Sequence, residues 1–447
     1  MICENKDLTQ GSLWKKIFLF SAPLMLSNVL QVLFNMADVA VVGRFAGSLA
    51  LGAVGSTTTL VTMFIGFLIG MSGGINVLVA LHYGAKNKKE IVKTVHTAAV
   101  LSAGIGLLLL LFGVVLARGI LQILHTKPEL IDGAVLYIRI YFLGMPALAL
   151  YNFGNAVFSA SGDTRRPLFY LTAVGITNVF LNLFFVIVCG LDVAGVALAS
   201  ILSQYLSAVL ILSALIRSRD DVRLRLSELH LDRDKARDIL NIGIPAGLQN
   251  VIFQVANLFV QVGVNSFDAT MVAGNSAAAN ADGLVYDVMA AFYTACGSFM
   301  GQNYGASKRK RVLRSYLICL AYSFGVGAVM GSLLVCFGSA FLGLFSADSS
   351  VIAAGMKRLT IMGFSYCISA FMDCTIAASR ALGKGVVPTV IVIMGSCVFR
   401  IIWVYTVFAY FKTIPSLYYL YVFSWSITAL AEIFYFVRIY RDKIAQI

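Results

Sequence analysis

The stretch PLMLSNVLQVLFNMADVAVVG, residues 23–43, decides the fold. It is an apolar run long enough to cross a bilayer, and it contains one carboxylate, Asp38. Polar side chains recur at steps of three and four residues, which places them on one helical face: Asn28, Gln31, Asn35 and Asp38. A charge inside a span costs roughly 2.5–3.5 kcal/mol, so it usually faces a cavity or a partner. Pro23 removes a backbone donor and predicts a helix bend. The alternative interpretation is a buried structural polar cluster.

Composition agrees with a membrane protein. The chain has 447 residues, of which 59% are hydrophobic and only 12% are charged. Apolar stretches recur from end to end, so we predict an all-α polytopic membrane protein with 12 transmembrane helices. We place these spans near residues 14–42, 51–81, 94–117, 131–159, 167–189, 192–216, 239–265, 275–303, 313–337, 352–379, 386–408 and 414–438.

The net charge of +13 fits this topology. Most basic residues fall in segments that twelve spans would place on one side, together with both termini, so we expect cytoplasmic termini in a bacterial cell membrane. We therefore interpret the charge as attraction to anionic lipid rather than nucleic-acid binding. No cysteine or histidine pair has metal-ligand spacing, and no nucleophile and base are paired, so we expect no metal site and no enzyme.

The chain is an internal duplication. Pro23 and Pro245 each open an amide-rich span, TyrGlyAla at 83–85 returns at 304–306, and Gly162–Pro167 matches Gly383–Pro388. We predict an amino-terminal six-helix lobe at 1–216, a cytoplasmic linker at 217–238 and a carboxy-terminal six-helix lobe at 239–447. An even number of spans per half makes this a parallel repeat, a plan in which the binding site lies between the halves.

The duplication gives the opening stretch a counterpart. A second polar face follows Pro245, with Asn250, Gln254, Asn257 and Gln261. Asn35 corresponds to Asn257, whereas Asp38 corresponds to Val260 and has no acidic twin. We predict that the two polar faces line one aqueous substrate cleft.

Several motifs resemble the multidrug and toxic compound extrusion (MATE) family. They are QVLFNMADVAVVGRFAG, the two TyrGlyAla turns with basic loops, SASGDTRRP and ASRALGKGVVP. The resemblance covers nearly the whole chain. It implies a V-shaped exporter of two six-helix lobes around a central cleft, driven by H⁺ or Na⁺ without any other cofactor.

The resemblance also implies a cation site in the first lobe. Asp38 falls on the family's cation-linked aspartate, and Asn178, Asn182 and Ser200 fall on its neighbours. The position of Asn182 often holds Asp in the family, so this chain has one negative charge fewer. We therefore expect H⁺ rather than Na⁺ as the coupling ion.

The second half holds further ionisable groups near the membrane. Asp287 is expected to line the substrate cleft and attract a cation. Arg400 is expected to form an intramembrane ion pair with Asp373 or Glu432, or else to contact substrate. We expect a monomer that exports lipophilic, often cationic, drug-like compounds; the alternatives are a lipid-linked oligosaccharide flippase of the same superfamily and an exporter of a non-drug metabolite.

Overall fold

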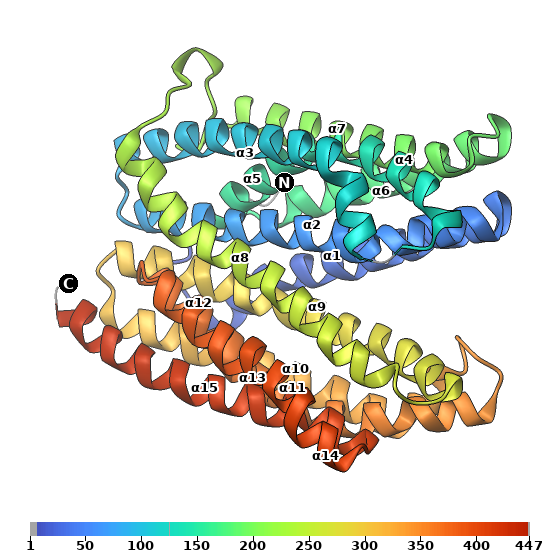
Figure 1. Ribbon diagram of the computed structural model, residues 1–447. Helices are drawn as coiled ribbons and strands as arrows, with labels where there is room; N and C mark the ends of the chain where they lie inside the picture. The colour runs from blue at the N-terminus through green and yellow to red at the C-terminus, as the bar shows by residue number, and fades with distance from the viewer. Residues whose placement is uncertain (1–6, 125, 446–447) are drawn as a thin grey trace. The chain divides into compact units, whose positions relative to one another are not determined.

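The computed structural model describes residues 7–124 and 126–445, and helices make up nearly all of this part of the chain (Figure 1). The elements, with η marking π-helical or 3₁₀ turns, are α1 (Leu13–Val41), η1 (Val42–Ala46), α2 (Gly47–Gly84), α3 (Lys88–Ile123), α4 (Pro128–Phe142), α5 (Met145–Ala160), α6 (Arg165–Leu183), η2 (Phe184–Val188), α7 (Asp192–Ile216), η3 (Leu226–Glu228), α8 (Arg233–Val264), α9 (Ala269–Gly305), α10 (Arg309–Leu342), α11 (Ser349–Ala381), α12 (Val386–Val392), η4 (Ile393–Val398), α13 (Phe399–Trp403), η5 (Val404–Phe408), α14 (Ala409–Phe411) and α15 (Ile414–Ala445).

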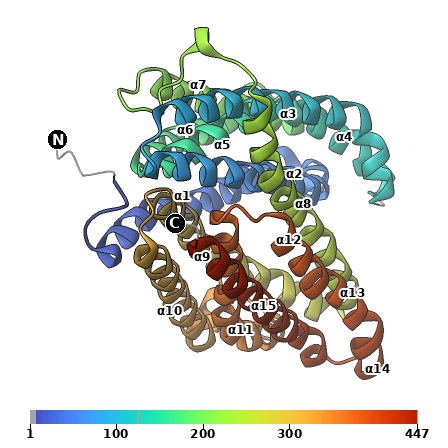
Figure 2. The same ribbon diagram turned by 90° about the vertical axis from the view of Figure 1, so that its left-hand side faces the viewer.

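The chain forms two compact units, each with its own core. The N-unit is Leu26–Gly247, and the C-unit joins the described residues up to Met25 to those from Leu248 onward. Within the N-unit, α5 packs against α2, α3 and α7. Within the C-unit, α11 packs against α9, α10 and α15, and Figure 2 shows these helices together as a bundle. Each unit therefore surrounds one central helix, and α5 and α11 are repeat partners.

The two long helices that contain proline belong to both units. The start of α1 packs in the C-unit, where Ile17, Phe20 and Leu24 join the cluster around Phe299. The rings of Phe20 and Phe299 meet edge-on at 5.4 Å. In the same way, Ile239 and Ile242 at the start of α8 lie in the N-unit core. The start of α1 therefore packs in the unit formed mainly by the second half of the sequence, and the start of α8 packs in the unit formed by the first half.

Small residues allow this exchange in the N-unit. A Cβ on Gly70 would lie 2.5 Å from the backbone of Ala246, and one on Gly74 would lie 2.8 Å from Gly243 N. The backbones of helices α2 and α8 are thus in close contact. Small residues spaced four apart permit such close packing of helices in membranes. Gly70 and Gly74 are repeat partners of Ala291 and Ala295, which are also small and buried in the C-unit.

The domain boundaries in the structure differ from the predicted lobes. The N-unit ends inside α8, and the predicted linker 217–238 contributes buried Val222 and Leu224 to the N-unit core. Lobes at 1–216 and 239–447 stay a prediction, as do the V shape and central cleft. Pro23 and Pro245 lie inside continuous helices, and the bend expected at Pro23 also stays a prediction.

Two predicted spans have a different local structure. The span predicted at 131–159 is divided between α4 and α5, which together are long and apolar enough to form one span but meet at a 48° bend after Phe142. Pro146, at the second position of α5, lacks the backbone donor that would continue α4. The span predicted at 386–408 is interrupted by the π-helical turns η4 and η5.

Counts of candidate spans support the membrane class. In the described residues, 9 helices are long and apolar enough to cross a membrane, or 10 if α4 and α5 form one bent span. One of them, Leu13–Gly84, has 72 residues and is far longer than one bilayer crossing, because η1 joins α1 to α2 without a loop. The chain is thus an all-helical, multi-pass membrane protein.

Candidate functional site

Asp38 and two asparagines come together in the N-unit. The Nδ2 of Asn182 donates to Asp38 Oδ1 at 2.5 Å and to Asn178 Oδ1 at 3.2 Å. Asn178 and Asn182 lie one turn apart on α6, whereas Asp38 lies on α1. Asn182 is fully buried. The structure therefore brings together three residues that the sequence analysis assigned to one site, across 144 positions of the chain.

The site has a third side formed by α4 and α7. Tyr137 and Tyr141 are electrostatic neighbours of Asp38, and their rings stack at 5.8 Å. Tyr137 also neighbours Ser200 of α7, which is buried. The sequence analysis missed both tyrosines. Their spacing of four residues on one face of a span was the available signal, since it aligns two phenols along a helix.

One amide of this cluster has an unsatisfied acceptor. The Oδ1 of Asn182 is buried without a hydrogen-bond partner, although buried polar atoms are nearly always satisfied. Gln204 on α7 is a hydrogen-bonding neighbour of Tyr141. Carboxylate and amide oxygens suit a proton or a hard cation. Within the described residues, no three His, Cys, Asp or Glu side chains are grouped as a transition-metal site would require.

A π-helical turn follows each of the two helices, α1 and α6, that supply Asp38 and Asn182. Turn η1 begins soon after Asp38, and η2 begins immediately beyond α6, just after Asn182. Such turns inside α-helices are rare and are frequently found at functional sites. Sequence periodicity did not predict them, because one extra residue in a turn barely changes an apolar pattern.

The polar face of α1 continues away from Asp38. Gln31 and Asn35 are exposed, and Asn28 is half-buried. The corresponding face of α8 lies in the C-unit. There Asn250 and Gln254 are half-buried, and Asn257 accepts a hydrogen bond from Arg400. The common cleft predicted for these faces concerns the two units together and stays a prediction.

A hydrogen-bonded network satisfies part of the α8 face. Gln261 donates to Asn265 at 2.8 Å and accepts from Asn275 at 3.4 Å. Asn275 Oδ1 in turn accepts from Arg358 at 2.5 Å and from Tyr418 at 2.7 Å. These bonds tie α8 to α9, α11 and α15, so part of the predicted cleft lining stabilises the C-unit.

The main ion pair of the C-unit was not predicted from the sequence. Arg358 on α11 lies 2.6 Å from Asp282 on α9, and Tyr366 also donates to this carboxylate. Both charged side chains are largely buried, at 10% and 14% exposure. Asp282 lies within the predicted span 275–303, so its charge was the available signal, but its partner Arg358 is identified only by the structure.

The ion pair predicted for Arg400 is not formed in this structure. Arg400 donates to the neutral amide of Asn257 at 3.0 Å. Both carboxylate oxygens of Glu432 and the Oδ2 of Asp373 are buried without hydrogen-bond partners. Asp287 on α9 is half-buried. The partner of the Arg400 guanidinium is thus a neutral amide rather than an acid. Helical periodicity does not indicate which of the two a buried arginine will contact.

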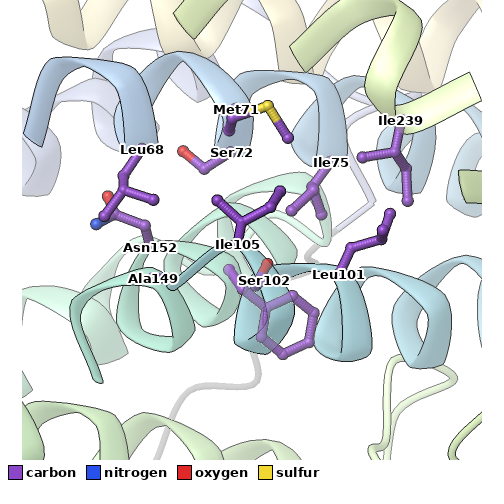
Figure 3. A pocket seen from close by; sticks show the side chains of 11 residues that line it. Leu68, Met71, Ser72, Ile75, Leu101, Ser102, Ile105, Ala149, Asn152 and Ile239 are labelled. Atoms are coloured by element: carbon purple, nitrogen blue, oxygen red, sulfur yellow. The ribbon is translucent and has the colours of Figure 1, made fainter. Parts of the chain in front are cut away.

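A small cavity in the N-unit does not accommodate substrate (Figure 3). It lies between α2, α3 and α5, with Ser72, Ser102 and Asn152 as its polar lining and apolar side chains around them. Its volume is about 10 Å³, which is room for one water molecule. Drug-sized ligands need cavities of roughly 300–1,000 Å³.

Comparisons with known proteins agree with the duplicated fold. The chain is 29% identical over 364 residues to a probable multidrug resistance protein, YpnP, of Bacillus subtilis, covering 80% of each chain. It is 24% identical to a probable multidrug resistance protein NorM of Thermotoga maritima, covering 89% of this chain and 86% of the relative. It is 23% identical to a FAD transporter of Shewanella oneidensis, covering 78% of each.

A solved structure has the same fold. It is described as an outward-facing conformation of a multidrug resistance MATE family transporter; it superposes with a TM-score of 0.91 over 99% of both chains, at 21% identity. The sequence pattern of the family described as MatE matches residues 23–184 and 245–406, so each match begins at one of the two repeat prolines. The chain therefore belongs to the MatE family of membrane transporters.

Proposed function

We propose that this protein is a proton-coupled antiporter that exports lipophilic, often cationic, compounds across the cell membrane. The relatives named multidrug resistance proteins support the class of substrate. The observation that carries the coupling is Asp38, an acid that accepts a hydrogen bond from Asn182 beside Asn178, with Tyr137 and Tyr141 as electrostatic neighbours, in the N-unit site. We further propose cytoplasmic termini and a functional monomer.

The chemistry of the site favours a proton. A carboxylate inside a span is costly while charged and much less so when protonated. Asn182 holds Asp38 by a hydrogen bond, and its unpartnered Oδ1 can accept the hydroxyl of a protonated acid after a small rotation. Na⁺ would find only one full negative charge here. Binding of a proton to Asp38 therefore gives a larger free-energy difference between the two transport states than binding of Na⁺.

Coupling follows if the two ligands favour different states. A proton on Asp38 removes the buried charge and allows α1 to repack, with Pro23 as the point of bending. Substrate leaves outward from the protonated state, and the return step releases the proton inside. A ligand with equal affinity for both states would shift nothing, so proton and substrate must prefer opposite states.

The test is export from reconstituted vesicles under separately imposed gradients. A proton gradient alone should drive release of a lipophilic cation, and a Na⁺ gradient at constant pH should not. Export driven by Na⁺ without any effect of pH would contradict the proton assignment. Absence of transport under either gradient would contradict export of this class.

A second candidate is export of a non-drug metabolite. The observation in its favour is the buried guanidinium of Arg400, which suits an anionic rather than a cationic compound. One relative is named a FAD transporter, although it shares only 23% identity. A lipid-linked oligosaccharide flippase has less support, since Arg358 is already paired with Asp282.

A further inference from the structure

Arg400 is buried with one edge of its guanidinium unpaired. The side chain lies on α13 and is 1% exposed. Nη1 donates to Asn257 Oδ1 at 3.0 Å, whereas Nε and Nη2 have no hydrogen-bond partner. These two atoms form the edge with which arginine holds both oxygens of a carboxylate or phosphate. The free edge therefore has the geometry of an oxyanion fork.

The surroundings of Arg400 hold it in place without neutralising it. Its Cζ lies 4.8 Å from the ring centre of Phe253 and 4.6 Å from that of Tyr421. Trp425 lies at 5.9 Å, and the Nε1 donor of this indole is also buried without a partner. Aromatic faces orient a guanidinium but accept none of its in-plane hydrogen bonds. Three neighbouring nitrogen donors, Nε and Nη2 of Arg400 and Nε1 of Trp425, thus lack an acceptor.

Acids occur nearby, but none accepts from this edge. Asp373 is an electrostatic neighbour of Arg400, and its Oδ2 has no hydrogen-bond partner. Glu432 and Arg380 are electrostatic neighbours of each other and of Asp373. Arg380 donates to Gln249 at 2.8 Å. The acids therefore group with Arg380, and the Nε/Nη2 edge of Arg400 remains without an anion.

The repeat places a polar contact between the same two helices in each unit. In the N-unit, the first and fifth helices of the half meet through Asp38 and Asn182. In the C-unit, the corresponding helices meet through Asn257 and Arg400. Turns η4 and η5 flank Arg400 on both sides, as η1 and η2 follow the N-unit pair. The N-unit pair leaves an acceptor unpaired, and the C-unit pair leaves donors unpaired.

We propose that Arg400 binds a carboxylate or phosphate group of the exported compound, with its Nε/Nη2 edge and Trp425 Nε1 as donors. This assignment rests on the proposed export function and narrows it to compounds that carry an anionic group, including zwitterions. Asn257 is half-buried and Arg400 is fully buried. The Asn257 amide keeps its bond to Nη1, and the oxyanion takes the opposite edge of the guanidinium.

The experiment compares two dyes that differ in one charge. Rhodamine B carries a cationic ring system and a free carboxylate, and its ethyl ester has the same ring system without the anion. Binding to the purified, detergent-solubilised protein is followed by fluorescence polarisation. The wild type should bind the acid more tightly than the ester, and Arg400→Gln should reduce this preference by about tenfold or more.

Controls separate recognition from structural damage. Arg118→Gln removes an exposed arginine that pairs with Asp132 at 2.6 Å, and it should leave the preference unchanged. Arg400→Lys keeps the charge but loses the fork, so it should retain only part of the preference. It replaces Arg400→Gln if that variant does not fold. Equal weakening of both dyes, an unchanged ratio, or a wild type that prefers the ester would overturn the proposal.

A second measurement does not depend on dye recognition. Acetate and inorganic phosphate, compared with chloride at equal ionic strength, should raise the melting temperature of the wild type by about 2 °C or more beyond the rise in Arg400→Gln. Equal rises would overturn the oxyanion site. If neither dye binds but the anions stabilise only the wild type, the site stands and drug export fails.

A last experiment tests whether the anionic group bound by Arg400 belongs to an exported compound or to a lipid headgroup. Phosphatidylglycerol added to the detergent-solubilised protein should leave the dye preference intact if the group belongs to an exported compound. Loss of the preference would assign Arg400 to a lipid headgroup and overturn the substrate assignment.

Discussion

The N-unit and the C-unit place opposite charges on corresponding helices of the repeat, about one helical turn apart in the alignment. In the N-unit, the first helix carries the acid Asp38 and the fifth supplies Asn182. In the C-unit, the first helix supplies the amide Asn257 and the fifth carries the base Arg400. Each charge meets a neutral carboxamide rather than its counterion. The duplication thus preserved the contact between two helices while its chemistry diverged.

Symmetry of the sequence repeat is therefore not accompanied by symmetry of the charged groups. The N-unit has one lone carboxylate and an unpaired acceptor, which suit a proton or cation. The C-unit has a satisfied ion pair, Arg358 with Asp282, and a separate guanidinium with unpaired donors. The first arrangement responds to a change of protonation. The second holds its charge at every physiological pH, because arginine does not deprotonate in proteins.

The largest effect is expected when the N-unit charge is removed. Asp38→Asn imitates the protonated acid and keeps a polar partner for Asn182, so the protein should insert and fold. Gradient-driven export should fall at least about tenfold, to the background of empty vesicles, because one state is then favoured permanently. Asp132→Asn, at an exposed ion pair, is the matched control and should export normally. Normal export by Asp38→Asn would contradict the proposal that Asp38 is the coupling acid of the N-unit.

The next effect tests the structural charge of the C-unit. Arg358→Leu leaves Asp282 buried without its partner, and breaking such a pair costs about 3–5 kcal/mol of stability. The repeat partner Arg139 is exposed, so Arg139→Leu should be nearly neutral. Melting temperatures in detergent provide the measurement. The double change Arg358→Leu with Asp282→Leu should recover part of the loss, and a double variant as unstable as the single one would contradict the pairing argument.

A smaller effect sharpens the cation assignment. Asn182→Asp places a second carboxylate at a position where the structure already brings Asp38 within 2.5 Å. Two like charges so close favour either a shared proton or a bound cation. Export by this variant should gain a Na⁺ dependence of about tenfold that the wild type lacks. If Na⁺ stimulates both proteins equally, the second acid is not what selects the ion.

The smallest effect concerns the start of α8, which the N-unit holds. Asp232 Oδ1 accepts from the backbone N–H groups of Lys235 and Asp234, both at 3.1 Å. The hydrogen bond from the backbone N–H of Lys235 contributes most, and together the bonds hold the pKa of Asp232 below its ordinary value. Its contribution to stability is therefore present above the unfolded pKa of about 3.9 and is lost as pH falls through the lower folded value.

Asp232→Ala should lower the melting temperature at pH 7 by roughly 1–2 °C. The difference from the wild type should vanish in acid, below the folded pKa of Asp232. A difference that stays constant down to acid pH would show that the carboxylate charge does not stabilise this helix start.

The fold class, the internal repeat and the intramembrane acid Asp38 could all be predicted from the sequence. Long apolar runs require helices that satisfy their own backbone in lipid, and the prolines and TyrGlyAla turns mark the duplication. The polar face of residues 23–43 identified Asp38, and the family resemblance named Asn178, Asn182 and Ser200 as its neighbours. Of these, the structure brings both asparagines to Asp38 and places Ser200 beside Tyr137.

The helix that each face contacts became clear from the three-dimensional structure. An apolar pattern shows that a face is buried but not which helix covers it, so the packing of the start of α1 around Phe299 was not predicted from the sequence. The same holds for Arg400, whose partner is a neutral amide rather than an acid. Hydrogen bonds between distant helices depend on distances of a few tenths of an ångström, and helical periodicity carries no information about them.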